Sequence, residues 1–479
     1  MSWRIRLAFG VGQYAEGVKG SAFSIFLLFY YTSIQNLSGT MAGVALLIAL
    51  CFDGVTDPLM GSISDAFKSR WGRRHPFMYG SAIPFALSFF LLFSPPSDLS
   101  EFQLFLWLTF FAILTRGLMT VYSVPHMAMN AELTNDYTER TTLSAIRVFF
   151  SLAGYLSVAG GGFAFFFRAT EKYSNGQLNP AAYPIFALVF ASLMVLVIWL
   201  SALGTHSEIP RLPQPPENID PLRLSRLFKE IKSSLQIQPF RRIIAAGFLF
   251  SAMLGTMLAL VIFGCTYFWG MSSGEIGTVI PVSILGVIVG TIITRPVSAF
   301  IGEKKQTYMV GMVWFAVFSS STILLRLVGF FPANGHWSIV PLVTTTNAIA
   351  YMGWGVCSAI TASMIADLTD EHERVHRVRQ EGIYYGASSL MAKVASGFGS
   401  FAAGIITDIS GVAGLSDPVL IDPAVILRFG LLWGPLPLVV CGIAVFVIRN
   451  YDIDHVRHAK ILQEIDIRKS TGKHLYKKV

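Results

Sequence analysis

Two aspartates stand four residues apart in a stretch of the chain that otherwise suits lipid. Asp53 and Asp57 lie in the segment FDGVTDPLMGSISD, which follows a run of small and aliphatic residues. On a helix the two carboxylates share one face, because they are one turn apart. An ionised carboxylate inside a bilayer is costly unless something neutralises it. The pair therefore predicts a site in which a positive charge lies between Asp53 and Asp57.

Three kinds of positive charge fit this pair. Pro58 frees the backbone carbonyl of Gly54 from its helical partner, so that carbonyl, the two carboxylates and the Thr56 hydroxyl would form an all-oxygen site for a hard cation such as Na⁺. A shared proton is the alternative, since close carboxylates resist simultaneous ionisation. The third is a structural ion pair with a basic residue. The candidate bases are Lys393, Arg147 and Arg116. Lys393 serves either interpretation, because it would compete with a bound cation.

The same segment continues into a basic turn. Gly61 and Asp65 form a GxxxD pattern, and a glycine-containing run of bases follows. Glycine allows helices to approach closely, and an acid at a helix end can pair with a base across the loop. The pattern predicts a packing and gating element and not a ligand site. Its members would be Gly61, Asp65, Arg70 and Arg73.

The elements that hold these residues must be membrane helices. Of the 479 residues 53% are hydrophobic and only 13% are charged, which excludes an ordinary soluble enzyme. A helix needs about 20 apolar residues to cross a bilayer, and twelve such segments recur. They are residues 10–32, 40–64, 76–94, 102–126, 142–167, 183–204, 240–268, 274–300, 307–330, 338–366, 381–409 and 424–449. The first lacks a small-residue cleavage site, so we expect it to be a retained helix.

Lysine and arginine gather in alternate loops between these segments. Since such residues stay on the cytoplasmic side, the pattern predicts a multi-pass protein of the cell (inner) membrane with both termini in the cytoplasm. The formal net charge of +8 then reflects topology. A nucleic-acid partner is not expected, because the bases are spread over loops and not gathered on one soluble domain.

Short internal repeats divide the chain. AELTND at Ala131 returns as ADLTDE at Ala366, and TDPLMGSISD at Thr56 returns more faintly as TRPVSAFIGE at Thr294, offsets of 235 and 238 residues. The near agreement predicts two six-helix halves in parallel arrangement, the layout of major-facilitator transporters. The predicted parts are a first half (1–204), a cytoplasmic linker with an amphipathic helix (205–239), a second half (240–449) and a basic cytoplasmic tail (450–479).

An energy source other than ATP is expected. The sequence STGKH at Ser470 lacks the upstream glycine and the strand of a nucleotide-binding loop. We therefore predict neither an enzyme nor a cofactor, and a coupling ion, Na⁺ or H⁺, as the driving force. The expected partners are a small-molecule substrate and the lipid bilayer, with the chain acting as a monomer.

Three segments resemble the signature regions of the glycoside–pentoside–hexuronide:cation symporters, a branch of the major facilitators. They are DGVTDPLMGSISDAFKSRWGRRHPF, VPHMAMNAELTNDYTERTTLSAIRVFFSLAG and MIADLTDEHERVHRVRQEGIYYGASSLMAKVASG. The resemblance covers both halves. It implies that the coupling-ion carboxylates are Asp53 and Asp57, that Thr120 supports them, and that Lys393 is the functional lysine of the eleventh span.

The resemblance is weaker at the substrate. Sugar-transporting members of this family hold hydroxyls with acids in spans one and four, and motif alignment puts Gly17 and Ser123 at those positions. Glu16 lies one residue away and Lys19 one turn on. The expected substrate residues are Glu16, Gly17, Lys19, Ser123, Arg147 and Lys393. The predicted function is cation-coupled symport of a sugar or glycoside by alternating access. The alternatives are transport of a lysolipid or other amphiphile on the same scaffold, and a membrane sensor that transports nothing.

Overall fold

The computed structural model describes residues 1–213, 235–377, 381–415 and 421–470. The predicted amphipathic linker helix lies outside the described residues for most of its length. Eleven helical spans in the described chain are long and apolar enough to cross a membrane. They are α4 (Gly39–Ala66), α5 (His75–Leu92), α6 (Glu101–Glu132), α7 (Tyr137–Ala159), α8 (Ala182–Thr205), α10 (Gln238–Phe263), α11 (Ser273–Ile301), α12 (Lys304–Leu327), α13 (Ile339–His376), α14 (Glu381–Ser410), and α15 (Pro423–Trp433) with α16 (Leu436–Ile448) as one span.

The predicted first span falls on a series of shorter helical segments. These are α1 (Trp3–Val11), α2 (Gln13–Ser21), the π turn η1 (Ala22–Phe26), α3 (Leu27–Phe29) and the π turn η2 (Tyr30–Ile34). None of them alone has the length of a span, but they follow one another along the chain as the twelfth crossing requires. The described residues contain no strand, and the predicted all-α membrane fold is confirmed.

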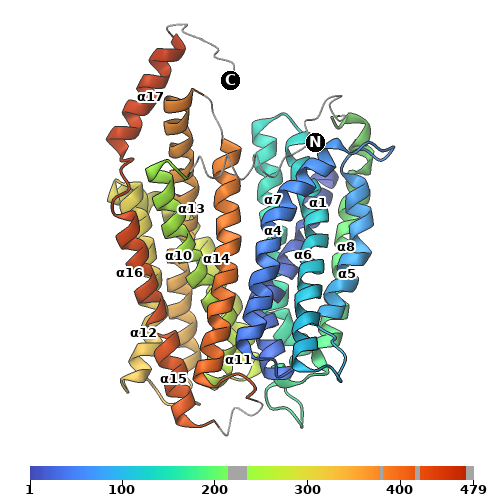
Figure 1. Cartoon of the computed structure of the whole chain (residues 1–479), viewed down its shortest axis with the longest axis vertical. Coiled ribbons are helices and arrows are strands. Elements are labelled where there is room, and N and C mark those ends of the chain that lie inside the picture. Colours follow the sequence, from blue (N-terminus) through green and yellow to red (C-terminus); the bar gives the residue numbers. More distant parts are fainter. Residues whose placement is uncertain (214–234, 378–380, 416–420, 471–479) are drawn as a thin grey trace.

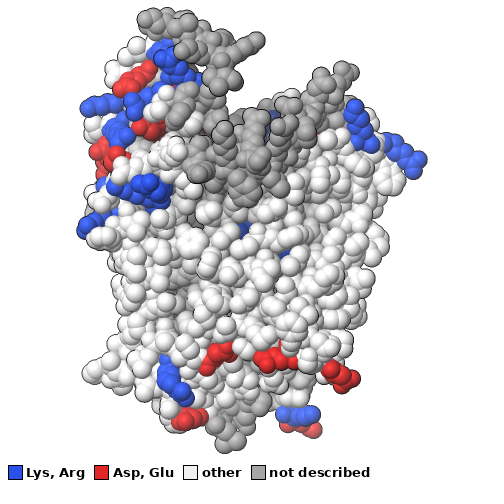
Figure 2. Space-filling view, in the orientation of Figure 1, with Lys and Arg blue, Asp and Glu red and all other residues white. Residues whose placement is uncertain are grey.

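Polar side chains begin several of these helices at the membrane surface. At the start of α6, the Ser100 side chain accepts a hydrogen bond from the Gln103 backbone N–H, and the Gln103 side chain accepts one from the Ser100 backbone N–H. Ser272 and Glu275 form the same pair of bonds at the start of α11. Such capping boxes satisfy backbone donors that a helix leaves open at its start. Between the ends, large apolar side chains such as Ile83, Leu87 and Phe110 are exposed. Figure 2 shows charged residues gathered at the two ends of the visible face, with a broad uncharged band between them apart from small blue patches.

The helices form two bundles that stand side by side (Figure 1). In the first bundle α2 packs on α7 and α4 packs on α6; in the second, α10 packs on α14 and α11 packs on α13. Counted as spans, these are the first with the fifth and the second with the fourth in each half. The start of α1 and the tail helix α17 (His455–Ser470) lie at the same end of the molecule, as an even number of crossings requires.

The two bundles are joined at the end away from α17. Asp408 of α14 accepts hydrogen bonds from the backbone N–H groups of Gly39 and Thr40, both at 2.7 Å, and so caps the start of α4 from the other half. Gln177 likewise accepts a hydrogen bond from Ser273 at 2.6 Å. Among the described residues, the hydrogen bonds and ring contacts between the bundles lie at this end or at mid-depth. The structure is therefore closed at the end opposite the termini.

The tail helix α17 forms ion pairs with the second half. Arg457 pairs with Glu371 at 3.0 Å, and the His458 ring contacts Asp370 at 3.1 Å. Arg374 of α13 reaches Glu464 in return, at 3.3 Å. These charged contacts hold α17 against the end of α13.

Close packing of α2 on α7 depends on glycine. A Cβ atom at Gly17 would lie 1.9 Å from the backbone oxygen of Ser151, and one at Gly154 would lie 2.2 Å from the backbone oxygen of Tyr14. Backbone atoms cannot rotate away as a side chain does. The two helices therefore touch through glycine on both sides, in the manner of small-residue contacts in membranes.

This contact predicts different outcomes for two glycines of α2. Gly17→Ala should destabilise the protein by about 1–3 kcal/mol, because overpacking forces the helices apart. Gly20→Ala is the matched control, since its Cβ would meet only Tyr155 Cδ2 at an ordinary 3.8 Å. The measurement is the thermal unfolding midpoint of the purified protein in detergent. Equal midpoints for the two variants would contradict the packing assignment.

Candidate ion-coupling and substrate site

Asp53 and Asp57 are held by two residues of α6. Arg116 Nη2 donates to Asp53 Oδ2 at 2.5 Å, and Thr120 Oγ1 donates to Asp57 Oδ1 at 2.8 Å. The two aspartates are one turn apart on α4, and Arg116 and Thr120 are one turn apart on α6. The two contacts therefore join successive turns of the same two helices. Thr120 therefore lies where the family resemblance implied.

Lys393 reaches the same carboxylates from the second half. Its ammonium group contacts Asp57 Oδ2 directly and lies 3.8 Å from Asp53 Oδ2. Asp53 and Asp57 lie near the middle of α4, which carries this ion pair to mid-depth in the bundle. The contact joins the two halves, so a change in the charge of Lys393 or of the aspartates would alter the interaction between them.

The ion pairs predicted as the structural alternative are present in this conformation. Two carboxylates face two cations, Arg116 and Lys393, so the cluster of four is electrically neutral. The Asp53 side chain is 3% exposed and the Arg116 side chain 8%, whereas those of Asp57 and Lys393 are both 32% exposed. One pair is therefore buried inside the first half, and the other is partly accessible at the interface.

One carboxylate oxygen of the cluster has no hydrogen-bond partner among the described residues. It is Asp53 Oδ1, which is buried. Thr56 Oγ1 donates instead to the backbone oxygen of Phe52 at 3.2 Å, within its own helix. Gly54 packs against α14, where a Cβ would meet Leu390 Cδ1 at 2.1 Å. Thr56 Oγ1 also lies 3.4 Å from the backbone oxygen of Asp53, so in the described chain its hydroxyl bonds to backbone oxygens and not to the carboxylates of Asp53 and Asp57.

A second charged group lies beside the first, on α2. Glu16 pairs with Lys19 at 3.0 Å and also interacts electrostatically with Lys393 and Arg116. Arg147 of α7 interacts with Glu16 in turn, and its Nε is buried without a hydrogen-bond partner among the described residues. The structure therefore brings four of the predicted substrate residues together, namely Glu16, Lys19, Arg147 and Lys393.

Gly17, one of the predicted substrate residues, packs against α7 and leaves no room for a side chain. Its α-carbon faces the backbone of Ser151 on α7, where no side chain fits. An acid at position 17 would clash with that backbone, so the carboxylate on this turn of α2 is Glu16. Ser123 is half-buried on α6, three residues beyond Thr120, and its role as a ligand stays a prediction.

The predicted gating element is built differently from the expectation. Arg74 contacts Asp65 at 2.5 Å and Glu132 at 2.6 Å, and Arg73 contacts Glu132 at 2.8 Å. Arg70 instead stacks on the Trp71 ring, at 5.4 Å from its centroid. Asp65 and Arg73 thus belong to an ion-pair cluster at the end of α4 and α6, whereas Arg70 does not.

A Cβ at Gly61 would meet Val124 Cγ1 of α6 at an ordinary 3.8 Å, so the close helix packing expected of this glycine is not found. Arg74 and Glu132 are the members that the sequence prediction missed. The repeat AELTND/ADLTDE could have found Glu132, because it pairs Glu132 with Asp367. In the second half Asp367 also bonds a base, Lys304, at 2.7 Å.

Two short motifs that match hydrolase patterns have structural roles here. Residues 372–376 read HERVH, the spacing of a zinc-peptidase helix, and 270–274 read GMSSG, the spacing of a nucleophilic serine. His372 shares a hydrogen bond with Tyr384 at 2.9 Å, Glu373 lies 3.8 Å from Arg468, and Ser272 caps α11. No group of three metal-ligating side chains occurs in the described part of the chain.

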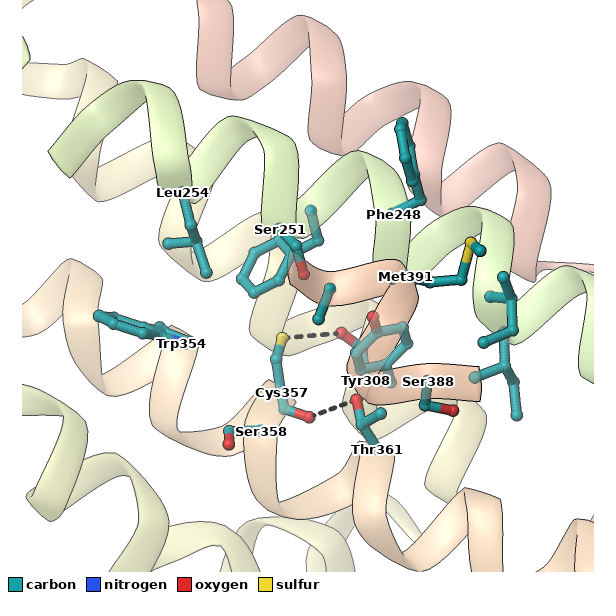
Figure 3. A pocket seen from close by; sticks show the side chains of 15 residues that line it. Phe248, Ser251, Leu254, Tyr308, Trp354, Cys357, Ser358, Thr361, Ser388 and Met391 are labelled. Carbon is teal, nitrogen blue, oxygen red and sulfur yellow. Dashed lines mark hydrogen bonds between the residues drawn. The ribbon is translucent and has the colours of Figure 1, made fainter. Parts of the chain in front are cut away.

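The second half contributes a cavity of about 220 Å³ (Figure 3). Four helices line it: α10, α12, α13 and α14. The lining includes Phe248, Ser251, Tyr308, Trp354 and Met391, and none of its fifteen residues is charged. The charges of the site thus lie in the first half, with Lys393 as the exception.

The family model for MFS/sugar transport proteins matches residues 8–455. The chain belongs to the MFS/sugar transport protein family. The isoprimeverose transporter of Lactiplantibacillus pentosus is 25% identical, with 97% of this chain and 91% of that protein covered. The glucuronide carrier protein homolog of Escherichia coli is also 25% identical, with 99% and 98% covered. The resemblance to the glycoside–pentoside–hexuronide:cation symporters is confirmed.

Solved structures show the same fold. The inward-open xylose transporter XylE of E. coli superposes with a TM-score of 0.63 at 14% identity, covering 97% of this chain and 98% of that one. This MFS/sugar transport family member is therefore a multi-pass membrane transporter and not an enzyme.

Removing one member of the buried ion pair should be costly. Arg116→Gln leaves Asp53 as a buried carboxylate without the cation that bonds it directly, and we expect a loss of about 3–5 kcal/mol in stability. The double variant Asp53→Asn/Arg116→Gln should recover most of this, because no uncompensated charge remains. Arg211→Gln is the control, since its pair with Glu208 is exposed and worth about 0–1 kcal/mol. A double variant no more stable than Arg116→Gln, by thermal midpoint in detergent, would contradict the assignment.

The gating cluster predicts a contrast between neighbouring arginines. Arg74→Ala removes contacts to two carboxylates, and at about 1.5–3 kcal/mol for a charged hydrogen bond it should change the balance of conformations at least about tenfold. Transport should slow, with little change in substrate affinity measured in a conformation-locked protein. Arg70→Ala removes the same charge from the same loop and should behave as wild type. Equal effects of the two variants on the transport rate would exclude the cluster as a gate.

Proposed function

We propose that the protein is a cation-coupled symporter of a sugar or glycoside that works by alternating access. The observation that carries the proposal is the contact of Lys393 with Asp57 and Asp53 across the two halves, at mid-depth in the membrane. A structural ion pair could lie within one half, whereas this one joins α4 of the first half to α14 of the second. An internal cation that competes with a transported one explains its place.

The coupling step follows from charge balance. When H⁺ or Na⁺ neutralises the negative charge at Asp57, Lys393 loses its partner and the tie between the halves weakens. Asp53 Oδ1 gives an incoming cation a second carboxylate contact. Arg116 keeps its pair with Asp53 throughout, since a guanidinium does not lose its proton. Asp57 is therefore the charge that changes, and Asp53 the charge that is held.

The released Lys393 can turn to the substrate. Glu16 is close enough to Lys393 and Arg147 to interact with both electrostatically, and it pairs with Lys19 at 3.0 Å. Charged groups make hydrogen bonds to hydroxyls about twice as strong as neutral ones do, so this group suits a sugar. Cation and substrate thus share Lys393, and each must raise the affinity of the other by the same factor.

We place the protein in a cell (inner) membrane. With both termini in the cytoplasm, the closed end of the structure faces outward and the conformation is inward-facing. The relatives in L. pentosus and E. coli are named for isoprimeverose and for glucuronide, which favours a sugar or glycoside as the cargo of this chain over a lysolipid.

The proposal is tested by Asp57→Asn in proteoliposomes. This variant should lose substrate accumulation driven by a Na⁺ or pH gradient, because the site no longer carries the negative charge that binds the cation. It should still let the substrate move down its own concentration gradient. Asp98→Asn, which removes an exposed loop carboxylate, is the control. Gradient-driven accumulation at the wild-type level by Asp57→Asn, at equal protein density, would refute coupling at this site. Imposing the two gradients separately on the wild type identifies the ion.

A further inference from the structure

The cavity of the second half is lined in part by the turn of α14 that carries Lys393. Its lining residues Met391 and Ala392 immediately precede Lys393 on α14. Two lining residues on facing helices, Ser358 of α13 and Ala392 of α14, are exposed. The cavity therefore has an open side, and a ligand bound at Lys393 would be close to it.

The walls of the cavity are apolar and aromatic. Phe248, Trp354, Leu254 and Met391 project from three helices around it (Figure 3). Several of its polar groups are already used by the helices that carry them. Thr361 Oγ1 donates to the Cys357 backbone oxygen at 2.8 Å, Ser388 Oγ donates to that of Tyr384 at 2.8 Å, and Cys357 Sγ donates to that of Tyr308 at 3.6 Å. The cavity thus offers aromatic faces and few free donors, which suits an apolar group.

The size of the cavity limits its occupant. An apolar cavity of about 150 Å³ in a protein takes up benzene. At about 220 Å³, this one has room for an aromatic ring with a few further atoms. Trp354 and Phe248 supply ring faces against which such a group would pack.

The two halves thus present opposite chemistry to a bound molecule. The first half supplies Glu16, Lys19 and Arg147, which suit hydroxyl groups, and the second supplies an uncharged cavity. We propose that this cavity binds the apolar aglycone of a glycoside whose sugar is held by the charged group around Lys393. This inference rests on the proposed function and narrows its substrate class to glycosides with an aromatic or similarly compact apolar aglycone.

Gly247 allows a direct test, because it lines the cavity and has free space around it. A Cβ at this position would have Tyr308 Oη, 4.0 Å away, as its nearest neighbour. Gly247→Leu should therefore fill the cavity without displacing backbone. Gly442→Leu is the matched control, a helix glycine in the same half with no atom within 4 Å of its Cβ and an exposed position. Ser358→Leu, at the open side, is a second variant should Gly247→Leu fail to fold.

The experiment measures binding of methyl and phenyl glycosides of the same sugars, across xylosides, glucosides and glucuronides, to the full-length protein in nanodiscs. Burial of a phenyl ring should give the wild type at least about a tenfold preference for the phenyl compound. Gly247→Leu and Ser358→Leu should remove that preference while methyl glycoside affinity stays within about twofold of wild type. Gly442→Leu should retain it.

Three results would overturn the inference. Equal affinity of the wild type for methyl and phenyl glycosides would remove the aglycone site while leaving sugar transport intact. Equal weakening of both ligands by Gly247→Leu would mean that the cavity only supports the sugar site. Binding of lysophospholipid but of no glycoside, lost in Gly247→Leu, would assign the cavity to an acyl chain and would refute the proposed function as well.

Discussion

The architecture depends on the need to neutralise two carboxylates in the middle of a membrane. Asp53 and Asp57 are too costly to leave unpaired there, and two helices, one from each half, supply their partners. Arg116 and Thr120 of α6 bind them within the first half, and Lys393 of α14 binds them from the second. The two cations differ in kind. A buried guanidinium paired with Asp53 is a permanent part of the first half, whereas a half-exposed ammonium on the opposite helix can leave its partner. A fixed pair beside a breakable one is what a charge-driven conformational change requires.

Backbone contacts through glycine occur both within and between the halves. Inside the first half they hold α2 against α7. Between the halves, a Cβ at Gly404 of α14 would lie 2.0 Å from the backbone oxygen of Gly39 of α4, and one at Gly43 would lie 2.8 Å from Phe401 Cα. Asp408 adds hydrogen bonds to backbone N–H groups at the start of α4, at the same end. The closed end is therefore held by close backbone packing as well as by hydrogen bonds, and opening it would separate both.

The two halves resemble each other more in how their helices pack than in the side chains that they present to the site. Glu132 and Asp367 occupy matching positions and each binds a base from the preceding loop region, Arg74 in one half and Lys304 in the other. In the second half the tail helix α17 adds its own charged contacts to the end of α13. The substrate side differs more strongly, with charged residues on the first half facing an uncharged cavity on the second. Such an asymmetric site would favour a molecule with one polar and one apolar end.

The sequence by itself determined the elements and the pair of carboxylates on which the proposed coupling depends. Apolar length predicts the spans, the repeats predict the halves, and the spacing of Asp53 and Asp57 places both on one face, because helical periodicity is a local property. The sequence could not predict which residue of another helix each aspartate contacts. Arg116 was one of three candidate bases, and only packing of α4 on α6 selected it for Asp53. Motif alignment assigned a ligand role to Gly17, but the proximity of α7 allows no side chain there and leaves Glu16 as the acid. Arg74 replaced Arg70 in the gating cluster for the same reason: which base of a short loop reaches an acid depends on how the loop folds back on the helix ends, and that is a matter of tertiary structure.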